Sequence, residues 1–172
     1  MTAAAAVADR IDAAWTALDK VPDPEVPVLS VRDLGIVRDV LERADGIEVV
    51  LTPTYSGCPA TEVIAESVRQ ALVDAGLGPV TVSHRRAPAW TTDWISAEGR
   101  RKLQAYGIAP PSGTTAMAPI AVGTIRIRPL GVACPRCGSD QTERLSAFGS
   151  TACKALYRCL ACREPFEYFK PI

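Results

Sequence analysis

The chain has 172 residues, of which 48% are hydrophobic, and its 19 basic and 19 acidic residues give a formal net charge of zero. This length favours one domain with an appendage, and the balanced charge gives a nucleic-acid partner no electrostatic support. No apolar run is long enough to span a membrane, and the N-terminus lacks the basic and hydrophobic regions of a signal peptide. We therefore expect a cytoplasmic protein that binds neither nucleic acid nor membrane.

The first part of the chain mixes helical and strand patterns. Ser30 is suited to cap a single helical turn that Gly35 closes, and Ser96 to cap a longer helix. The proline-rich loop Val21–Pro27 ends the first helix. We expect, in chain order, a helix over residues 5–20, a hairpin with strands at 36–41 and 47–51, a helix over 60–75, a strand over 80–84 and a helix over 96–106.

Four cysteines in two C-x-x-C pairs dominate the last part of the chain: Cys134, Cys137, Cys159 and Cys162. Doubled pairs at this separation predict a tetrahedral cage that suits zinc, and a cage closed by four protein ligands is structural rather than catalytic. A rubredoxin-like iron site would use the same ligands. Cys153 has no partner two or three residues away, which favours a buried packing role over a ligand, with a transient ligand or reactive thiol as the alternatives.

These patterns predict an α/β (α+β-like) fold, in which a small mixed sheet with helices is followed by a C-terminal Cys₄ zinc ribbon. We expect an N-terminal domain over residues 1–107, a linker rich in proline, glycine and small residues over 108–124, and the ribbon over 125–172. Within the ribbon the predicted strands are 142–148, 155–158 and 165–169.

A second group of candidate residues lies in the N-terminal part. Cys58 directly precedes Pro59, which suits a first helical position, so Cys58 is predicted to be the N-cap, where the helix dipole favours a thiolate. A small residue that buries the helix start is an equally good interpretation. Asp23 and Glu25 flank a rigid proline and could bind metal, act in acid–base chemistry or form a solvated turn, and Thr52 is among the hydroxyl-bearing residues before Cys58.

Several short motifs in series resemble the SufT-like metal-sulfur cluster assembly family. They are the segments Asp23–Pro27, Asp33–Val37, Val49–Thr54 and Gly57–Pro59, and the resemblance runs from about residue 12 to residue 82. With Pro88–Trp94 and the ribbon added, nearly the whole chain is similar to the family of D subunits of phenylacetyl-CoA epoxidase systems. This resemblance implies aerobic bacterial degradation of phenylacetate by a di-iron oxygenase, to which an iron–sulfur flavoprotein reductase supplies electrons.

The resemblance implies an accessory subunit that assembles or maintains an iron–sulfur or di-iron centre and has no catalytic activity of its own. Cys58 would be the functional thiol that transiently holds iron or an iron–sulfur cluster, with Asp23, Glu25 and Thr52 lining its loop. The implied partners are the other oxygenase and reductase subunits. One cysteine cannot cage a cluster, so a homodimer or a partner's thiol is also implied.

Three other functions compete with this interpretation. A purely structural subunit of the oxygenase complex is the main alternative, and a nucleic-acid-binding ribbon is weaker because the charge is neutral. A di-iron monooxygenase would need Glu and Glu-x-x-His ligand sets, and the single histidine of the chain, His84, cannot supply them.

Overall fold

The computed structural model describes residues 3–55, 60–111 and 131–172. The chain forms two compact units, Met1–Gly99 and Arg100–Ile172, and each is described by itself. The boundary falls inside one helix, α3 (Ala97–Tyr106).

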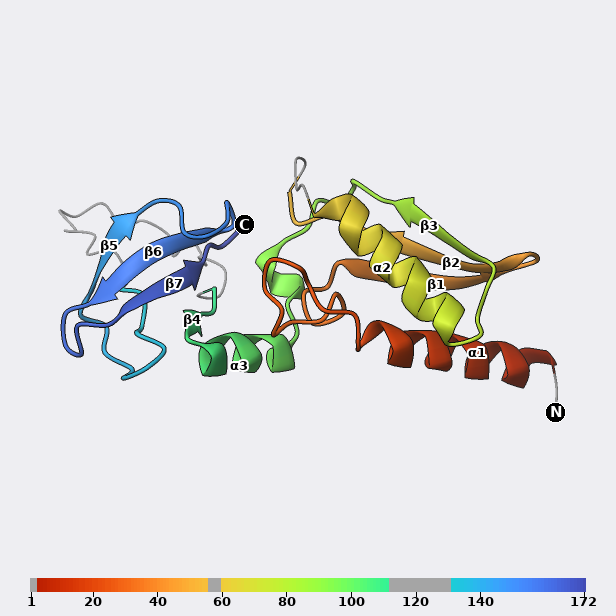
Figure 1. Ribbon diagram of the computed structural model, residues 1–172, viewed down its shortest axis with the longest axis horizontal. Helices are drawn as coiled ribbons and strands as arrows, with labels where there is room; N and C mark the ends of the chain where they lie inside the picture. The colour runs from red at the N-terminus through yellow and green to blue at the C-terminus, as the bar shows by residue number, and fades with distance from the viewer. Residues whose placement is uncertain (1–2, 56–59, 112–130) are drawn as a thin grey trace, which may run out of the picture. The chain divides into compact units, whose positions relative to one another are not determined.

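The first unit contains a three-stranded mixed sheet with the order β1-β2-β3. β1 and β2 form an antiparallel hairpin, whereas β2 and β3 are parallel and are joined through α2, as a parallel connection requires. α2 crosses one face of the sheet, and α1 packs against α2 and β1 (Figure 1). The elements of this unit are α1 (Ala3–Leu18), β1 (Val37–Arg43), β2 (Gly46–Leu51), α2 (Thr61–Asp74), β3 (Val80–His84) and the short 3₁₀ helix η1 (Thr92–Trp94).

The core of this unit lies between the sheet and the helices. Alternate residues of β2 point to one face, and Ile47, Val49 and Leu51 on that face are all buried. α2 contributes Val68 and Leu72, both without exposed surface. Burial of apolar surface of this kind contributes about 25 cal/mol per Å² to the free energy of folding.

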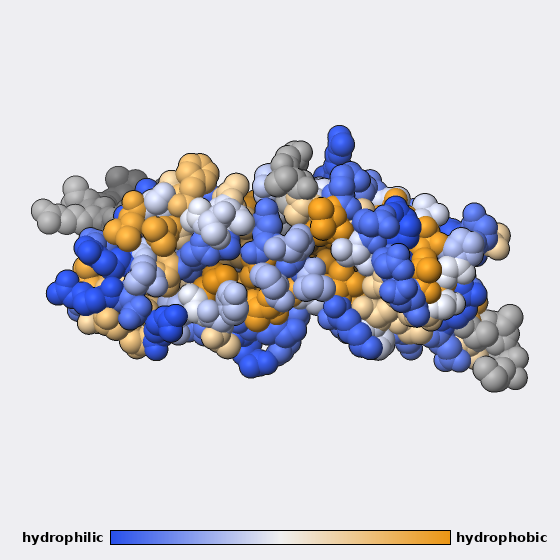
Figure 2. Space-filling model, in the orientation of Figure 1, coloured by the Kyte–Doolittle hydropathy of each residue, from blue (hydrophilic) through white to orange (hydrophobic). Residues whose placement is uncertain are grey.

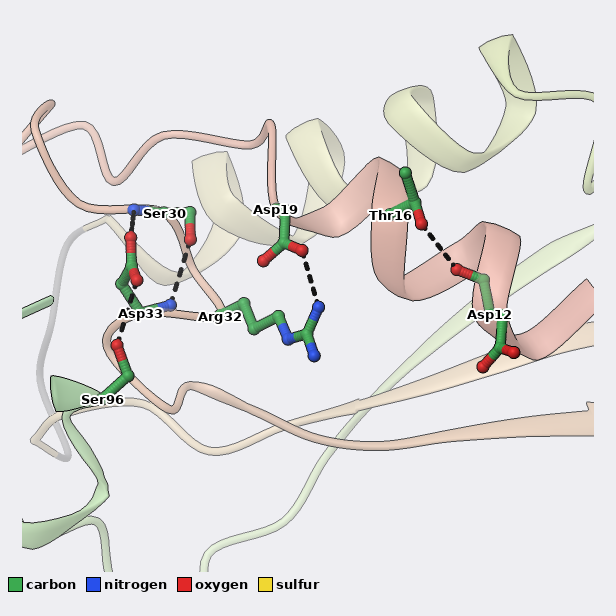
Figure 3. Close-up of polar contacts among 7 residues, drawn as sticks. All are labelled: Asp12, Thr16, Asp19, Ser30, Arg32, Asp33 and Ser96. Carbon is green, nitrogen blue, oxygen red and sulfur yellow. Dashed lines mark hydrogen bonds and ion pairs between the residues drawn. The ribbon is translucent and has the colours of Figure 1, made fainter. Parts of the chain in front are cut away.

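A buried carboxylate, Asp33, organises the turn before β1 (Figure 3). Its Oδ2 accepts from the Ser30 backbone N–H at 3.1 Å, and its own N–H donates to Ser30 Oγ at 3.0 Å. Its Oδ1 accepts from Ser96 Oγ at 3.0 Å, and Ser96 Oγ in turn accepts from the Gly99 N–H at 2.8 Å. Ser30 and Ser96 are therefore both caps, as predicted, and one carboxylate joins the turn before β1 to the start of α3.

The segment before α3 packs onto the same turn. Trp90 donates from Nε1 to the Leu34 carbonyl at 2.8 Å, and Arg38 lies 3.5 Å from the centre of the Trp94 ring. Gly35 has φ +69°, and a Cβ there would lie 2.5 Å from the Trp94 carbonyl oxygen. This close approach leaves room only for glycine.

The second unit contains a four-stranded sheet with the order β4-β7-β6-β5. β5, β6 and β7 are antiparallel neighbours, and β4 pairs in parallel with β7. On β6 the ammonium group of the buried residue Lys154 lies 3.0 Å from Glu167 of β7. The strands are β4 (Ile108–Ala109), β5 (Thr142–Ser146), β6 (Lys154–Cys159) and β7 (Pro165–Phe169).

The predicted fold class is confirmed, and the predicted helices and strands are present with shifts of a few residues. α2 begins at Thr61, close to the predicted start, and the Ile64 N–H donates to the Ala60 carbonyl at 2.9 Å. Cys58 and Pro59 lie outside the described residues, so the capping role of Cys58 stays a prediction. No local pattern predicted η1, or β4, which occupies the first two residues of the predicted linker. The predicted domain boundaries remain predictions.

The described surface is mixed in character. On the face drawn in Figure 2, areas of hydrophobic residues are bordered by hydrophilic ones. None of the helices in the described ranges has the length and apolar character needed to cross a membrane.

We predict that Asp33→Ala destabilises the first unit by about 3 kcal/mol, because it removes a cap and leaves buried donors without a partner. The three tryptophans of the chain, Trp15, Trp90 and Trp94, all lie in this unit, so urea unfolding followed by tryptophan fluorescence reports on it alone. Asp12→Ala, on the exposed surface of α1, is the matched control and should change the stability by less than about 0.5 kcal/mol. Equal effects of the two substitutions would contradict the assigned role.

Candidate functional site

Four cysteine side chains of the second unit converge on one point. One sulfur atom from each of Cys134, Cys137, Cys159 and Cys162 lies within 4.8 Å of the others. The Sγ atoms of Cys134 and Cys162 are 3.8 Å apart, and those of Cys137 and Cys159 are 3.6 Å apart. Metal–sulfur bonds of about 2.3 Å in a regular tetrahedron place the sulfurs about 3.8 Å apart. The four residues therefore fit a tetrahedral metal ion.

Each cysteine pair lies on a tight turn, which we call knuckle one (Cys134–Gly138) and knuckle two (Cys159–Arg163). In knuckle one the Gly138 N–H donates to the Cys134 carbonyl at 2.9 Å. In knuckle two the Cys162 N–H points to the Cys159 sulfur at 3.5 Å. Knuckle one precedes β5 and knuckle two joins β6 to β7, so the antiparallel ribbon brings the two knuckles together.

The metal centre is continuous with the small core of this unit. Cys134 and Cys159 have no exposed surface, and they belong to a buried cluster that includes Phe166 and Tyr168. The second cysteine of each pair, Cys137 or Cys162, is exposed. Because the core is small, a metal ion bound by the four cysteines would supply folding free energy to the unit.

The cysteine thiols cannot all ionise together. A hydrogen bond from the Cys162 backbone N–H lowers the pKa of the Cys159 thiol to about 6. For Cys162, a hydrogen bond from the Glu164 backbone lowers the pKa, but desolvation and the neighbouring cysteine sulfurs outweigh it and raise the value to about 12. A metal ion would bind by displacing the remaining protons, and its charge would stabilise all four thiolates.

Cys153 is not part of this group. It is buried, and its sulfur lies 3.0 Å from Thr151 Oγ1. Its backbone carbonyl accepts from the Lys170 N–H at 2.9 Å, which joins the start of β6 to the end of β7. This is the packing role that its lack of a nearby partner cysteine predicts.

In the first unit, Asp23 shapes the proline-rich loop. Its Oδ1 accepts from the backbone N–H groups of Glu25 at 2.9 Å and Val26 at 2.7 Å, and its own N–H donates to the Leu29 carbonyl at 2.8 Å. Asp23 is buried, and Glu25 is half-buried. A carboxylate that accepts two backbone N–H groups is a loop-forming residue, so at least one of its oxygens is committed to holding the backbone.

Thr52 follows directly after β2 and is also buried. Its N–H donates to the Ile36 carbonyl at 2.8 Å, and the Ile36 N–H donates to the Val31 carbonyl at 3.1 Å. Its hydroxyl oxygen is buried and has no hydrogen-bond partner among the residues that the structure describes. A buried hydroxyl without a hydrogen bond costs about 1–3 kcal/mol, so among the described residues the Thr52 hydroxyl adds no hydrogen bond to the fold.

The fourth predicted residue of this group, Cys58, lies outside the described residues. The structure therefore positions Asp23, Glu25 and Thr52 but leaves their grouping with Cys58 a prediction. Sequence reasoning missed two features that the structure reveals: the connection from Asp33 to Ser96, and the left-handed backbone of Arg163 (φ +67°) in knuckle two.

We predict that Cys137→Ser reduces the affinity for a divalent metal at the four-cysteine centre by at least about tenfold, because one thiolate is lost. The same substitution at the buried non-ligand Cys153 is the matched control and should leave the metal content unchanged. Metal content per chain, measured after dialysis against a chelator, checks both. Retention of metal by the Cys137 variant at the wild-type level would contradict the assigned ligand set.

Comparison with known proteins agrees with both units. Residues 123–170 match the family described as PaaD zinc beta ribbon domain, and residues 11–83 match the family described as iron-sulfur cluster assembly protein. The chain is 50% identical over 158 residues to the D subunit of the "Putative 1,2-phenylacetyl-CoA epoxidase" of Escherichia coli (strain K12), covering 92% of this chain and 91% of that protein.

Two further similarities concern the first part of the chain. It is 38% identical over 88 residues to an "Fe-S protein maturation auxiliary factor" of Porphyromonas gingivalis (strain ATCC BAA-308 / W83), covering 50% of this chain and 83% of that protein. A crystal structure of a domain of unknown function, DUF59, from Bacillus anthracis superposes with a TM-score of 0.53 at 24% identity, covering 58% of this chain and 96% of that one. The latter likeness shows a shared fold.

The 50% identity extends over nearly the full length of both proteins and includes the ribbon as well as the assembly-type unit. The chain therefore belongs to the family of D subunits of 1,2-phenylacetyl-CoA epoxidase.

Proposed function

We propose that this protein is an accessory subunit of a phenylacetyl-CoA epoxidase system and acts in the assembly or maintenance of its iron–sulfur or di-iron centre. The observation that carries the proposal is the combination of an iron-sulfur cluster assembly match over residues 11–83 with near full-length similarity to the D subunit of an epoxidase. The other epoxidase and reductase subunits are then its partners, in the cytoplasm.

In this proposal Cys58 holds iron or a cluster as cargo and passes it to the client. Asp23 holds the backbone of the proline-rich loop through the N–H groups of Glu25 and Val26, and the carboxylate of the half-buried Glu25 helps to position a cation. The orphaned hydroxyl of Thr52 is a hydrogen-bond donor or acceptor for the bound cargo. One thiol cannot close a cluster, so a second copy of the chain or a client's thiol completes the ligand set.

The four-cysteine centre has a structural role in this proposal. We propose that it holds zinc, because the ligand set is complete and none of the described residues around it calls for redox chemistry. Zinc there would stabilise the ribbon without taking part in cargo transfer. The ribbon would then serve as a platform that binds the client.

A purely structural role in the oxygenase complex is the second candidate, favoured by the name of the 50% identical relative, which is a subunit name. The two candidates differ in what happens to the metal of the enzyme. An assembly factor is needed for metal loading, whereas a structural subunit is needed for a fixed stoichiometry in the complex.

We predict that Cys58→Ser fails to restore growth on phenylacetate in a strain that lacks its own D subunit, because the oxygen of serine is a poor ligand for iron or a cluster. Cys153→Ser, the same change at a buried cysteine outside the proposed site, should restore growth. Full growth with the Cys58 variant, at matched protein levels, would rule out the thiol mechanism.

We also predict that the epoxidase and reductase purified from the deletion strain contain less iron per chain than the same proteins from the wild-type strain, while their subunit ratios are unchanged. Iron analysis of the purified proteins, followed by reconstitution with iron and sulfide, tests this. Fully metallated enzyme with altered subunit ratios would favour the structural role instead.

A further inference from the structure

The two metal knuckles place different residues at the same backbone position. The residue after the second cysteine is Gly138 in knuckle one, with φ +75°, and Arg163 in knuckle two, with φ +67°. Glycine adopts this left-handed region freely, whereas a residue with a Cβ is strained there. In the described ranges Arg163 is the only non-glycine residue with positive φ. A strained residue at this position suggests that its side chain has a use.

That use is not found within the described part of the chain. The Arg163 side chain is exposed, and among the described residues it forms no ion pair and no cation–π contact. On the same knuckle Leu160 is 40% exposed and Ala161 is exposed. Knuckle two thus carries an exposed apolar side chain, Leu160, and three residues later the exposed guanidinium group of Arg163.

Knuckle one, in contrast, has a contact partner within this chain, which is the end of helix α3. The Pro135 carbonyl accepts from Gln104 Nε2 of α3 at 3.1 Å. The Arg136 guanidinium lies 3.6 Å from the position that a Cβ on Gly107 would occupy, and Gly107, with φ +92°, directly follows α3. Knuckle one therefore packs on the carboxyl-terminal end of a helix, where a cation meets the negative end of the helix dipole.

We propose that knuckle two is a docking surface for the carboxyl-terminal end of a helix on a partner protein. Arg163 meets the terminal carbonyl groups of that helix, and Leu160 packs against its last turn. The positive charge of Arg163 favours this partner, because the carboxyl-terminal end of a helix carries a partial negative charge. The inference rests on the proposed function for the identity of the partner, which is another subunit of the epoxidase system.

The test uses the full-length, zinc-loaded protein and the variant Arg163→Gly. Glycine relieves the backbone strain and removes the charge, so the ribbon should become as stable or more stable, with slower amide hydrogen exchange in β6 and β7. Its binding to the purified epoxidase subunits, measured by titration at low salt, should weaken at least tenfold. Arg144→Ala, on the exposed edge strand β5, is the matched control and should bind like the wild type.

Two further variants sharpen the result. Leu160→Ser should also weaken binding, because it removes the apolar contact but leaves the charge. A photoreactive residue in place of Leu160 should crosslink to the last turn of a partner helix, and a crosslink to a loop or a strand would overturn the assigned occupant.

Other outcomes would overturn the proposal. Faster hydrogen exchange or loss of zinc to a chelator in Arg163→Gly would mean that Arg163 serves the fold or the metal. Binding at the wild-type level by Arg163→Gly, or no binding by the wild-type protein, would also overturn the docking surface.

The two proposals can fail independently of each other. If Arg163→Gly binds normally while Cys58→Ser abolishes growth, the docking surface fails and the proposed assembly function stands. If a strain with Cys58→Ser grows normally while Arg163→Gly loses binding, the proposed thiol mechanism fails and the docking surface stands.

Discussion

The tetrahedral arrangement of four cysteine sulfurs is the constraint on which the second unit depends. Two of the buried cysteines, Cys134 and Cys159, are also members of its apolar core, so the four-cysteine centre and the core share residues. A unit of this size buries little apolar surface, and the coordination of a metal supplies free energy that packing alone does not. In both knuckles the residue directly after the second cysteine, Gly138 or Arg163, has a left-handed backbone conformation.

In the first unit, polar contacts around the apolar core connect segments that lie far apart in the sequence. Asp33 contacts Ser96, 63 residues later, and Trp90 reaches the Leu34 carbonyl over 56 residues. These bonds hold the turn that precedes β1, and the hydrogen bond from Thr52 to Ile36 brings the end of β2 to the same turn. These hydrogen bonds fix the start of the predicted functional loop, which is the kind of preorganisation that the proposed metal-transfer site would need.

Much of this could be predicted from local patterns. The spacing of the cysteines predicted the metal centre, and apolar periodicity together with serine caps predicted the helices and strands. β4 could not be predicted in this way, since Ile108 and Ala109 form a strand only by pairing with β7, far along the chain. The conformation of Arg163 was also hidden, because arginine does not favour positive φ.

In the proposed function, the four-cysteine metal centre stabilises the ribbon and the thiol of Cys58 carries the cargo. Metal analysis and absorption spectra of the anaerobically purified protein, with Cys58→Ser beside the wild type, test this division most directly. We predict one zinc ion per chain in both proteins, and iron absorbance after reconstitution in the wild type alone. Equal iron absorbance in both proteins, or iron in place of zinc at the four cysteines, would contradict it.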